Sequence, residues 1–457
     1  MIHAFSVQNF KSLNTDEVAI YPLTVLSGIN NAGKTTFIQS ILELSRYYDR
    51  KTKVVSSIPV LSNYQTKVLD HKTDNLIGFH MKVDLNKSTS LEIDIKFSYS
   101  EKAKGGYPSY CKINFTSPDG NLLLEIRKDD PTNPYSFHSE NGLSLLFGKL
   151  KKRKVPPTVL DGVGDFEFFG YVPIQAKLHF KENPHLLEWF EQSDESDGHV
   201  QVSVNTAELL IDTIFNVKYI GPLRNHPKEY YFFESRGMEI DSSGENTFEV
   251  LDRIRSKPIK FYKNLGDAKP KQMTLLKAVQ YWVDYFQNGA KFTIKKKADN
   301  LIQVLINGHT INNSGFGFSQ IIPIIVQALL LQKNQLLLLE QPEIHLHPEL
   351  EYKLAYFMLC IVKNKRQIIA ETHSEHIVNQ LIMSKMDDES VQKLFGIYFL
   401  EKKENGTTDF KNINISEYGE VKNWPKGFFD QYLQFTKNLV YKRKEKALQQ
   451  SQLAAEK

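Results

Sequence analysis

A glycine-punctuated loop close to the N-terminus has the residue types that bind phosphate. It spans 28–36, with a glycine, four further residues and then Gly33-Lys34-Thr35, and it follows the apolar run 23–26. Such a loop curls backbone N–H groups around a phosphate at the positive end of a helix, while its lysine reaches the outer phosphates and its threonine ligates Mg²⁺. An ordinary glycine-rich turn is the alternative, but strand, loop and helix follow in the order that phosphate binding requires. The expected nucleotide contacts come from Asn30, Asn31, Ala32, Gly33, Lys34, Thr35 and Thr36.

An apolar strand that ends in an acid is predicted far downstream. The run 336–339 consists of leucine and leads directly into Glu340, followed by Gln341-Pro342-Glu343. A carboxylate at the end of such a strand holds the Mg²⁺ of a phosphate loop directly or through water. A buried parallel strand would have the same apolar pattern, although it would not need the acid. We therefore expect Glu340 to join Thr35 at Mg²⁺, with the middle of the chain inserted between the two halves of one site.

A histidine follows the next apolar run. Residues 367–370 predict a buried strand, and Glu371-Thr372-His373-Ser374 comes after it. A histidine in this place often only caps or packs. One strand beyond the acidic strand, however, it has the position of a γ-phosphate sensor, so we expect His373 to act in the site.

A second helix start carries small residues. Ser314-Gly315-Phe316-Gly317-Phe318-Ser319-Gln320 precedes the apolar run 321–331. We expect Ser319 to cap this helix and Pro323 to lie in its first turn. Bare N–H groups at a helix N-terminus form an anion site of their own. A single nucleotide needs only one such site, unless the second serves the nucleotide of a neighbouring copy.

Composition sets wide limits on the class of protein. The 457 residues are 41% hydrophobic and 24% charged, in the range of globular proteins, and no apolar run approaches the length of a membrane span. The N-terminus lacks the features of a signal peptide, so we expect a cytoplasmic protein without a membrane partner. Two cysteines argue against a zinc cluster or a disulfide framework. A net charge of +4 neither demands nor excludes nucleic acid, and the basic runs 149–154 and 295–297 are either solvated turns or a DNA-binding face.

The pattern along the chain predicts an α/β fold with two halves of one ATPase head. Residues 1–135 carry the phosphate loop, a helix from about 33 to 48 and an antiparallel β lobe whose strands alternate from 76 to 127, with a hairpin turn at 117–120. Residues 136–215, with a short helix at 184–190, are expected to form an inserted α+β arm. Residues 216–400 form the second half, including a helix over 271–287 and β alternation over 291–311. Residues 401–457 form an extension that ends in a polar helix from about 430.

This set of motifs resembles the ABC-type P-loop ATPases of the RecF, SMC and Rad50 type, and in particular the overcoming-lysogenization-defect (OLD)-like group. The resemblance covers the first 50 residues and about 310–385. It is carried by segments 9–13, 28–36, 315–320, 340–348 and 371–374, with weaker support from 220–224 and 424–430.

The resemblance implies an ATP-dependent head-to-tail dimer or larger homo-oligomer. Lys34 and Thr35 of one protomer would hold ATP and Mg²⁺, and Gly315, Gly317, Ser319 and Gln320 of the other would cap the γ-phosphate. It also implies that Lys11 and Ser12 lie near the nucleotide and that His373 reads the γ-phosphate. His345 and His347 resemble metal ligands, but here we expect them to shape a loop at the dimer interface. Arg224 either reaches phosphate across an interface or pairs within its own turn.

The chain departs from the family pattern in two places. Gln341 occupies the position of the usual catalytic glutamate, and because glutamine orients water without accepting its proton, hydrolysis is either slow or dependent on Glu343. The C-terminal nuclease domain of OLD nucleases is not evident in the sequence after His373. By resemblance, we expect the ATPase subunit of a two-component antiphage system of the Septu or PARIS type, paired with a separate nuclease. The alternatives are a nucleotide-gated scaffold with little hydrolysis and a RecF-like DNA-repair ATPase.

Overall fold

The computed structural model describes a large part of the chain. The described residues are 1–45, 64–101, 105–118, 120–130, 132–140, 159–169, 172–179, 199–203, 217–233, 238–313, 316–423, 425, 429 and 442. Four predicted features fall outside them in whole or in large part: the basic run 149–154, the short helix 184–190, Gly315 and the polar helix after 430.

A six-stranded sheet, here called the central sheet, holds the two halves of the predicted head together. Its order is β12-β19-β20-β3-β21-β22, and all neighbours are parallel except β21 and β22. The N-terminal strand β3 therefore lies between two strands of the C-terminal half, β20 and β21. The strands are β3 (Leu23–Gly28), β12 (Lys218–Ile220), β19 (Leu336–Glu340), β20 (Gln367–Glu371), β21 (Phe395–Lys402) and β22 (Thr408–Asn412).

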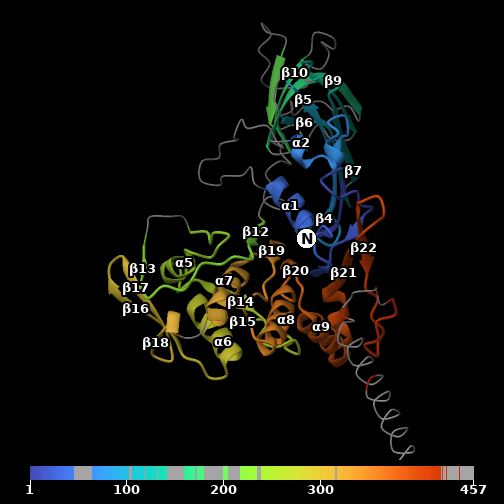
Figure 1. Ribbon diagram of the computed structural model, residues 1–457. Coiled ribbons are helices and arrows are strands. Elements are labelled where there is room, and N and C mark those ends of the chain that lie inside the picture. The colour runs from blue at the N-terminus through green and yellow to red at the C-terminus, as the bar shows by residue number, and fades with distance from the viewer. Residues whose placement is uncertain are drawn as a thin grey trace, which may run out of the picture.

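Alternating side chains give the central sheet two buried faces. On β19, Leu336 and Leu338 pack into one apolar core, and Leu337 and Leu339 pack into the other. This is the period of two that a strand imposes, applied to a run in which every residue is apolar. The first core contains α1 (Lys34–Ser45) and the antiparallel lobe, and the second contains the helices of the C-terminal half. Figure 1 shows these layers above and below the central sheet.

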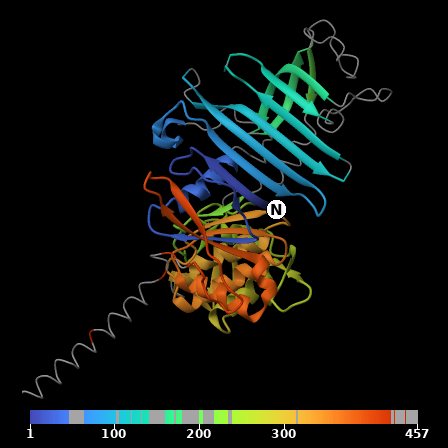
Figure 2. The ribbon, with the colours of Figure 1, turned by 90° about the vertical axis from the view of Figure 1, so that its right-hand side faces the viewer.

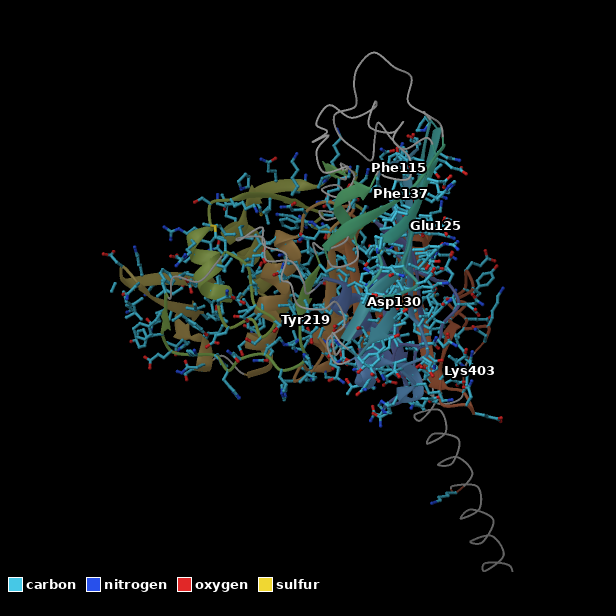
Figure 3. All side chains as sticks on the ribbon, turned by 90° about the horizontal axis from the view of Figure 1, so that it is seen from above. Phe115, Glu125, Asp130, Phe137, Tyr219 and Lys403 are labelled. Carbon is cyan, nitrogen blue, oxygen red and sulfur yellow. The ribbon has the colours of Figure 1, made fainter. Side chains whose placement is uncertain are left out.

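The antiparallel lobe is a ten-stranded sheet, here called the outer sheet, in the order β11-β10-β9-β8-β7-β6-β5-β4-β1-β2. Its long central strands cross the upper part of Figure 2, and Figure 3 labels Phe115, Glu125 and Phe137 on three neighbouring strands, β6, β7 and β8. The described strands of the stretch predicted as an arm, β9 to β11, extend this same sheet. The strands are β1 (Ile2–Gln8), β2 (Val18–Ala19), β4 (Ile77–Asp84), β5 (Ser90–Ser100), β6 (Gly105–Ser117), β7 (Gly120–Arg127), β8 (Tyr135–Glu140), β9 (Val159–Phe169), β10 (Val172–His179) and β11 (His199–Ser203).

The second half covers the central sheet with helices. They are α5 (Thr247–Arg253), α6 (Leu275–Gln287), α7 (Phe316–Leu330), α8 (Pro348–Val362) and α9 (Glu375–Asp387), and α2 (Tyr64–Lys67) lies in the lobe. Short 3₁₀ turns are η1 (Leu69–His71), η3 (Ile311–Asn313) and η4 (Glu389–Leu394). Two small sheets contain β13 (Tyr231–Phe232), β16 (Phe292–Ala298), β17 (Leu301–Ile306) and β18 (His309–Thr310), and the pair β14 (Pro258–Phe261) and β15 (Lys271–Thr274).

The α/β class with an antiparallel lobe is confirmed, and two local predictions are wrong. Residues 271–274 form β15 and not the start of a helix, because they pair antiparallel with β14 in a hairpin. Helix α7 already begins at Phe316, so Ser319 lies inside its first turn and Pro323 lies in its interior. None of the described helices is long and apolar enough to cross a membrane.

Candidate nucleotide-binding site

The phosphate loop connects β3 to α1 and needs glycine at both ends. Gly28 has φ of 141° and Gly33 has φ of 106°, values that L side chains rarely adopt. A Cβ at Gly28 would overlap the carbonyl oxygen of Leu400, and one at Gly33 would overlap the hydroxyl of Thr408. Asn31 also has positive φ, 62°, which asparagine tolerates. The loop is therefore fixed against β21 and β22.

Lys34 is enclosed by this loop. The residue is 3% exposed, and its Nζ donates to the carbonyl oxygens of Gly28, at 3.0 Å, and Ile29, at 2.8 Å. Burial lowers the pKa of Lys34, while Glu371 and Glu343 act in the opposite direction. An ammonium held only by carbonyl oxygens gains more from a phosphate, because charge-assisted hydrogen bonds are the stronger kind.

Thr35 faces a carboxylate that the sequence prediction did not include. Its Oγ1 donates to Glu371, at 2.8 Å and 3.1 Å to the two carboxylate oxygens. Glu371 ends β20 directly opposite Glu340, which ends β19. Burial and then the charge of Glu371 raise the pKa of Glu340 to about 7, while a hydrogen bond from Tyr219 lowers it. The signal that could have identified Glu371 is the one that identified Glu340, an acid at the carboxyl end of a buried strand.

These groups fit Mg²⁺. Two carboxylates and a threonine hydroxyl are the oxygen ligands that Mg²⁺ uses together with phosphate oxygens and water. Burial of Glu340 and the charge of Glu371 both disfavour its ionised form, and a divalent cation would offset both effects. Thr35, Glu340 and Glu371 would therefore hold the ion. In the described part of the chain, no three or more histidine, cysteine, aspartate or glutamate side chains are grouped so that they could hold a metal ion by themselves.

The turn after β19 joins the other predicted catalytic residues. Gln341 has φ of 43°, and its backbone N–H donates to the carbonyl oxygen of Glu371 at 2.9 Å. The carboxylate of Glu343 accepts from the backbone N–H of His373 at 2.7 Å, and burial raises its pKa. His373 is partly exposed to solvent. Its partial burial, and then the charge of Lys34, lower its pKa. The carboxyl ends of β19 and β20 thus bring Glu340, Gln341, Glu343 and His373 together.

Arg224 supports the same turn from within the chain. It is 6% exposed, and its Nη2 lies 3.4 Å from the carbonyl oxygen of Pro342 and 3.5 Å from that of Gln341. Burial lowers its pKa to about 10, against the effect of Glu343. Arg224 therefore contacts the turn after β19 and not its own turn, a contact that neither interpretation from sequence included.

Lys11 and Ser12 both lie beside the phosphate loop. The Ser12 hydroxyl is 3.1 Å from that of Thr408, the side chain that contacts Gly33. Lys11 donates to Gln39 on α1 at 2.7 Å. Thr408, which the sequence did not single out, joins these elements.

The second helix start lies against the turn after β19. A Cβ at Gly317 would overlap the carbonyl oxygen of His345, and Gln320 donates to the carbonyl oxygen of Asn225 at 3.2 Å. Ser319 is buried in α7. His347 is the N-cap of α8 and accepts from the backbone N–H of Glu349 at 3.3 Å. The chain leads from α7 into β19, and β20 lies between β19 and β3, the strand that leads into the phosphate loop.

The chain was compared with solved structures and with proteins of curated function. Two solved structures that it resembles are an SMC head bound to the C-terminal winged-helix domain of ScpA, at 10% identity and a TM-score of 0.42, and the SMC head domain from Thermotoga maritima, at 9% identity and a TM-score of 0.35. Each alignment covers 91% of this chain, with 98% of the first structure and 99% of the second. No protein of curated function matches the chain.

Two family models match the sequence. Residues 393–439 match a family described as a protein of unknown function, DUF3696. Residues 1–378 match the model of the AAA ATPase domain, AAA_15, which covers the phosphate loop, the acidic strand and His373. The chain therefore belongs to the AAA ATPase domain family.

Proposed function

We propose that this protein hydrolyses ATP slowly and uses ATP binding as a switch that closes an assembly of two or more copies. The observation that carries the proposal is the arrangement of Lys34, Thr35, Glu371 and Glu340 at one edge of the central sheet. It joins a phosphate-binding cation to a pair of carboxylates in register.

Each of these residues has a defined task in the proposal. Lys34 exchanges the carbonyl oxygens of Gly28 and Ile29 for the outer phosphates. Thr35, Glu371 and Glu340 hold Mg²⁺, which when bound neutralises phosphate charge. His373 contacts the terminal phosphate. Its backbone N–H donates to the carboxylate of Glu343, so a shift of His373 also shifts that carboxylate.

Glu343 is the proposed proton acceptor. Gln341 can only orient water, whereas Glu343 is a carboxylate whose pKa is raised by burial, the direction that a general base requires. Its hydrogen bond to His373 connects it to phosphate sensing. If Glu343 does not accept the proton, we propose the alternative function, a nucleotide-gated scaffold. Gln341, which cannot accept a proton, is the observation that supports this alternative.

The turnover test uses four proteins with ATP: wild type, Lys34→Ala, Glu343→Gln and Gln341→Glu. We expect Glu343→Gln to lower turnover about a hundredfold and Gln341→Glu to raise it several-fold, within the range of general-base effects. ATP binding should survive in both. If wild type binds ATP but its turnover equals that of Lys34→Ala, the protein is a nucleotide-gated scaffold and the proposal that it hydrolyses ATP is wrong.

A second copy would complete the site. Gly317 and Gln320, on α7, contact His345 and Asn225 of their own chain. The strand that follows α7 is β19, and β20 lies between β19 and β3. We propose that this segment faces the phosphate loop of a neighbouring protomer. Particle mass should rise on adding Mg²⁺-ATP to wild type but not to Ser319→Arg or to the exposed-site variant Asn313→Arg. The control Lys277→Glu, on α6, should assemble normally. Masses that do not depend on nucleotide would contradict the composite site.

The partner of this assembly is proposed from the family resemblance. We propose a separate nuclease in cytoplasmic antiphage defence, tested by co-purification with the product of an adjacent reading frame, with and without ATP. The RecF-like alternative predicts salt-sensitive DNA binding by the isolated protein. Lys295 and Lys297, exposed on β16, would then be among the contacts.

A further inference from the structure

A strongly basic pocket lies at the opposite end of β19 and β20 from the nucleotide site. Its volume is about 220 Å³. Lys333 comes shortly before β19, and Arg366 comes directly before β20, whereas Glu340 and Glu371 end those strands. The pocket is therefore separated from the phosphate loop by the length of a strand. Its lining includes Lys260, Tyr262, Lys333, Lys363, Lys365 and Arg366.

Arg366 is the buried member of this pocket. It is 5% exposed, and its Nη2 donates to the carbonyl oxygens of Lys260, at 3.0 Å, and Leu329, at 3.3 Å. Its Nη1 is buried and has no hydrogen-bond partner among the described residues. Burial alone accounts for a pKa lowered to about 10, with no carboxylate acting against it. A buried guanidinium with an unsatisfied donor is costly, and such groups are ordinarily paired.

The loops that carry these cations are fixed. The backbone N–H of Asn334 donates to the carbonyl oxygen of Lys365 at 2.7 Å, which joins the segment before β19 to the segment before β20. Lys363 donates to the carbonyl oxygens of Leu265 and Asp267. These contacts hold the backbone of the two segments together and position Lys363, whereas the side chains of Lys260, Lys333 and Lys365 are exposed.

The excess of positive charge in the pocket is not neutralised within the described part of the chain. Of the ion pairs there, none involves Lys260, Lys333, Lys363, Lys365 or Arg366. Asp388 is an acid that feels the charge of Lys363, but without an ion pair. Lys333 also repels the ammonium of the N-terminus. This concentration of like charge favours an anion over a cation or an apolar ligand.

We propose that this pocket binds a small molecule carrying one or two phosphate groups, at a second site distinct from the ATP site. A guanidinium offers paired donors that match phosphate geometry, and the lysines supply point charges around it. The volume is below that typical for a whole nucleotide-sized ligand, which limits the ligand to a compact one. The cations converge on a concavity from three segments of the chain and do not form a stripe, so a small phosphate ester fits better than a nucleic-acid backbone.

Pyrophosphate is the probe for this site, and calorimetric titration of the full chain is the measurement. The background is Lys34→Ala, so that the phosphate loop contributes little binding. We expect saturable binding of one pyrophosphate in this background. Adding Lys333→Glu and Lys365→Glu should weaken it by at least about tenfold, since charged hydrogen bonds are lost and repulsion replaces attraction. Adding Lys277→Glu, a single charge reversal on exposed α6, should alter it by less than about twofold.

Three results would overturn the proposal. The first is the lack of saturable pyrophosphate binding, and the second is equal weakening by Lys277→Glu, which would indicate only the overall charge of the protein. The third is displacement of bound pyrophosphate by a short single-stranded oligonucleotide. If the affinity for the oligonucleotide falls with salt as steeply as contacts to several phosphates require, the site binds nucleic acid. Pyrophosphate should also raise the melting temperature of the Lys34→Ala protein and of its Lys277→Glu derivative, but not of the doubly reversed one. This melting measurement shows as well that each variant folds.

Discussion

The two ends of β19 and β20 differ in the way their charges are balanced. At the carboxyl ends, Glu371 lies opposite Glu340 and acts on the cation Lys34, while burial and then the charge of Glu371 raise the pKa of Glu340. At the amino ends, Lys333 and Arg366 have cations as neighbours. The same two strands therefore end in a site prepared for a cation with phosphate and begin in a site prepared for an anion alone. Charge of one sign without compensation marks a place where a ligand supplies the rest.

Of the changes predicted here, removal of Lys34 should have the largest effect, a loss of ATP turnover at the carboxyl ends of the strands. Lys34→Ala removes the cation of the carboxyl end, and we expect ATP turnover to fall by at least about a hundredfold because several charge-assisted hydrogen bonds to phosphate are lost. Folding should be little affected, since the lysine donates only to loop carbonyls. The measurement is steady-state ATP hydrolysis with the melting temperature of each protein. Lys277→Ala is the control, and turnover in Lys34→Ala similar to that of the control would show that hydrolysis occurs elsewhere.

Glu371 is the test of the carboxylate pair. Glu371→Gln keeps the size of the side chain that accepts from Thr35 but removes its charge, so we expect the Mg²⁺ concentration for half-maximal turnover to rise about tenfold, the usual cost of weakening a metal ligand or its support. Glu340→Gln should act in the same direction. Glu92→Gln, on β5 of the outer sheet, is the matched control. An unchanged Mg²⁺ requirement in Glu371→Gln would mean that Glu371 only orients Thr35.

The sequence predicted one carboxylate of this pair and not the other, for a physical reason. Lys34, Thr35 and Glu340 are recognisable from local patterns, a glycine loop and an acid after a leucine run. The importance of Glu371 depends on β20 lying between β19 and β3, and the order of strands in a sheet is not contained in the order along the chain. Thr408 was missed for the same reason, since only strand pairing brings it to Gly33.

The basic pocket could not be predicted for a related reason. The sequence draws attention to basic runs such as 295–297, whose lysines are exposed on β16. The pocket combines cations from three short segments, and the unsatisfied donor of Arg366 appears only when the burial of its neighbours is known. The continuous leucine run, in contrast, predicted β19 well, because each of its four leucines packs into one of two cores.

The pH dependence of stability should separate the two ends. The folded-state pKa of Glu340 is about 7, above its ordinary value of 4.5, so the folded protein holds this proton more tightly than the unfolded chain. The stabilisation is fully present below pH 4.5 and is lost as pH rises through 7. For one carboxyl group we expect a loss of roughly 1 to 3 kcal/mol in the free energy of unfolding.

Denaturant unfolding at pH 5 and pH 8 measures this loss. Wild type should lose more stability than Glu340→Gln over the interval, since glutamine does not titrate and can still accept from Tyr219. Mg²⁺ at pH 8 should restore more stability to wild type than to the variant. Parallel profiles for the two proteins would show that burial and Glu371 together do not raise the pKa of Glu340. The variant Lys333→Gln at the amino end should leave the difference between pH 5 and pH 8 as in wild type.

The smallest predicted effect concerns the amino ends themselves. If the basic pocket is a place of uncompensated repulsion in the unliganded protein, Lys333→Gln with Lys365→Gln should raise the free energy of unfolding by roughly 0.5 kcal/mol at low salt, the scale of exposed charge pairs. The gain should vanish in about 1 M NaCl, where screening acts within a few ångströms. Lys277→Gln should show no such salt dependence. A gain that persists at high salt would have to come from backbone or packing changes, and a loss at low salt would mean that the cations are compensated within the protein. Either result would contradict the proposed difference between the two ends of β19 and β20, because the amino ends would then carry no uncompensated positive charge. Removal of Lys34, at the other end, is expected to lower activity with little effect on stability.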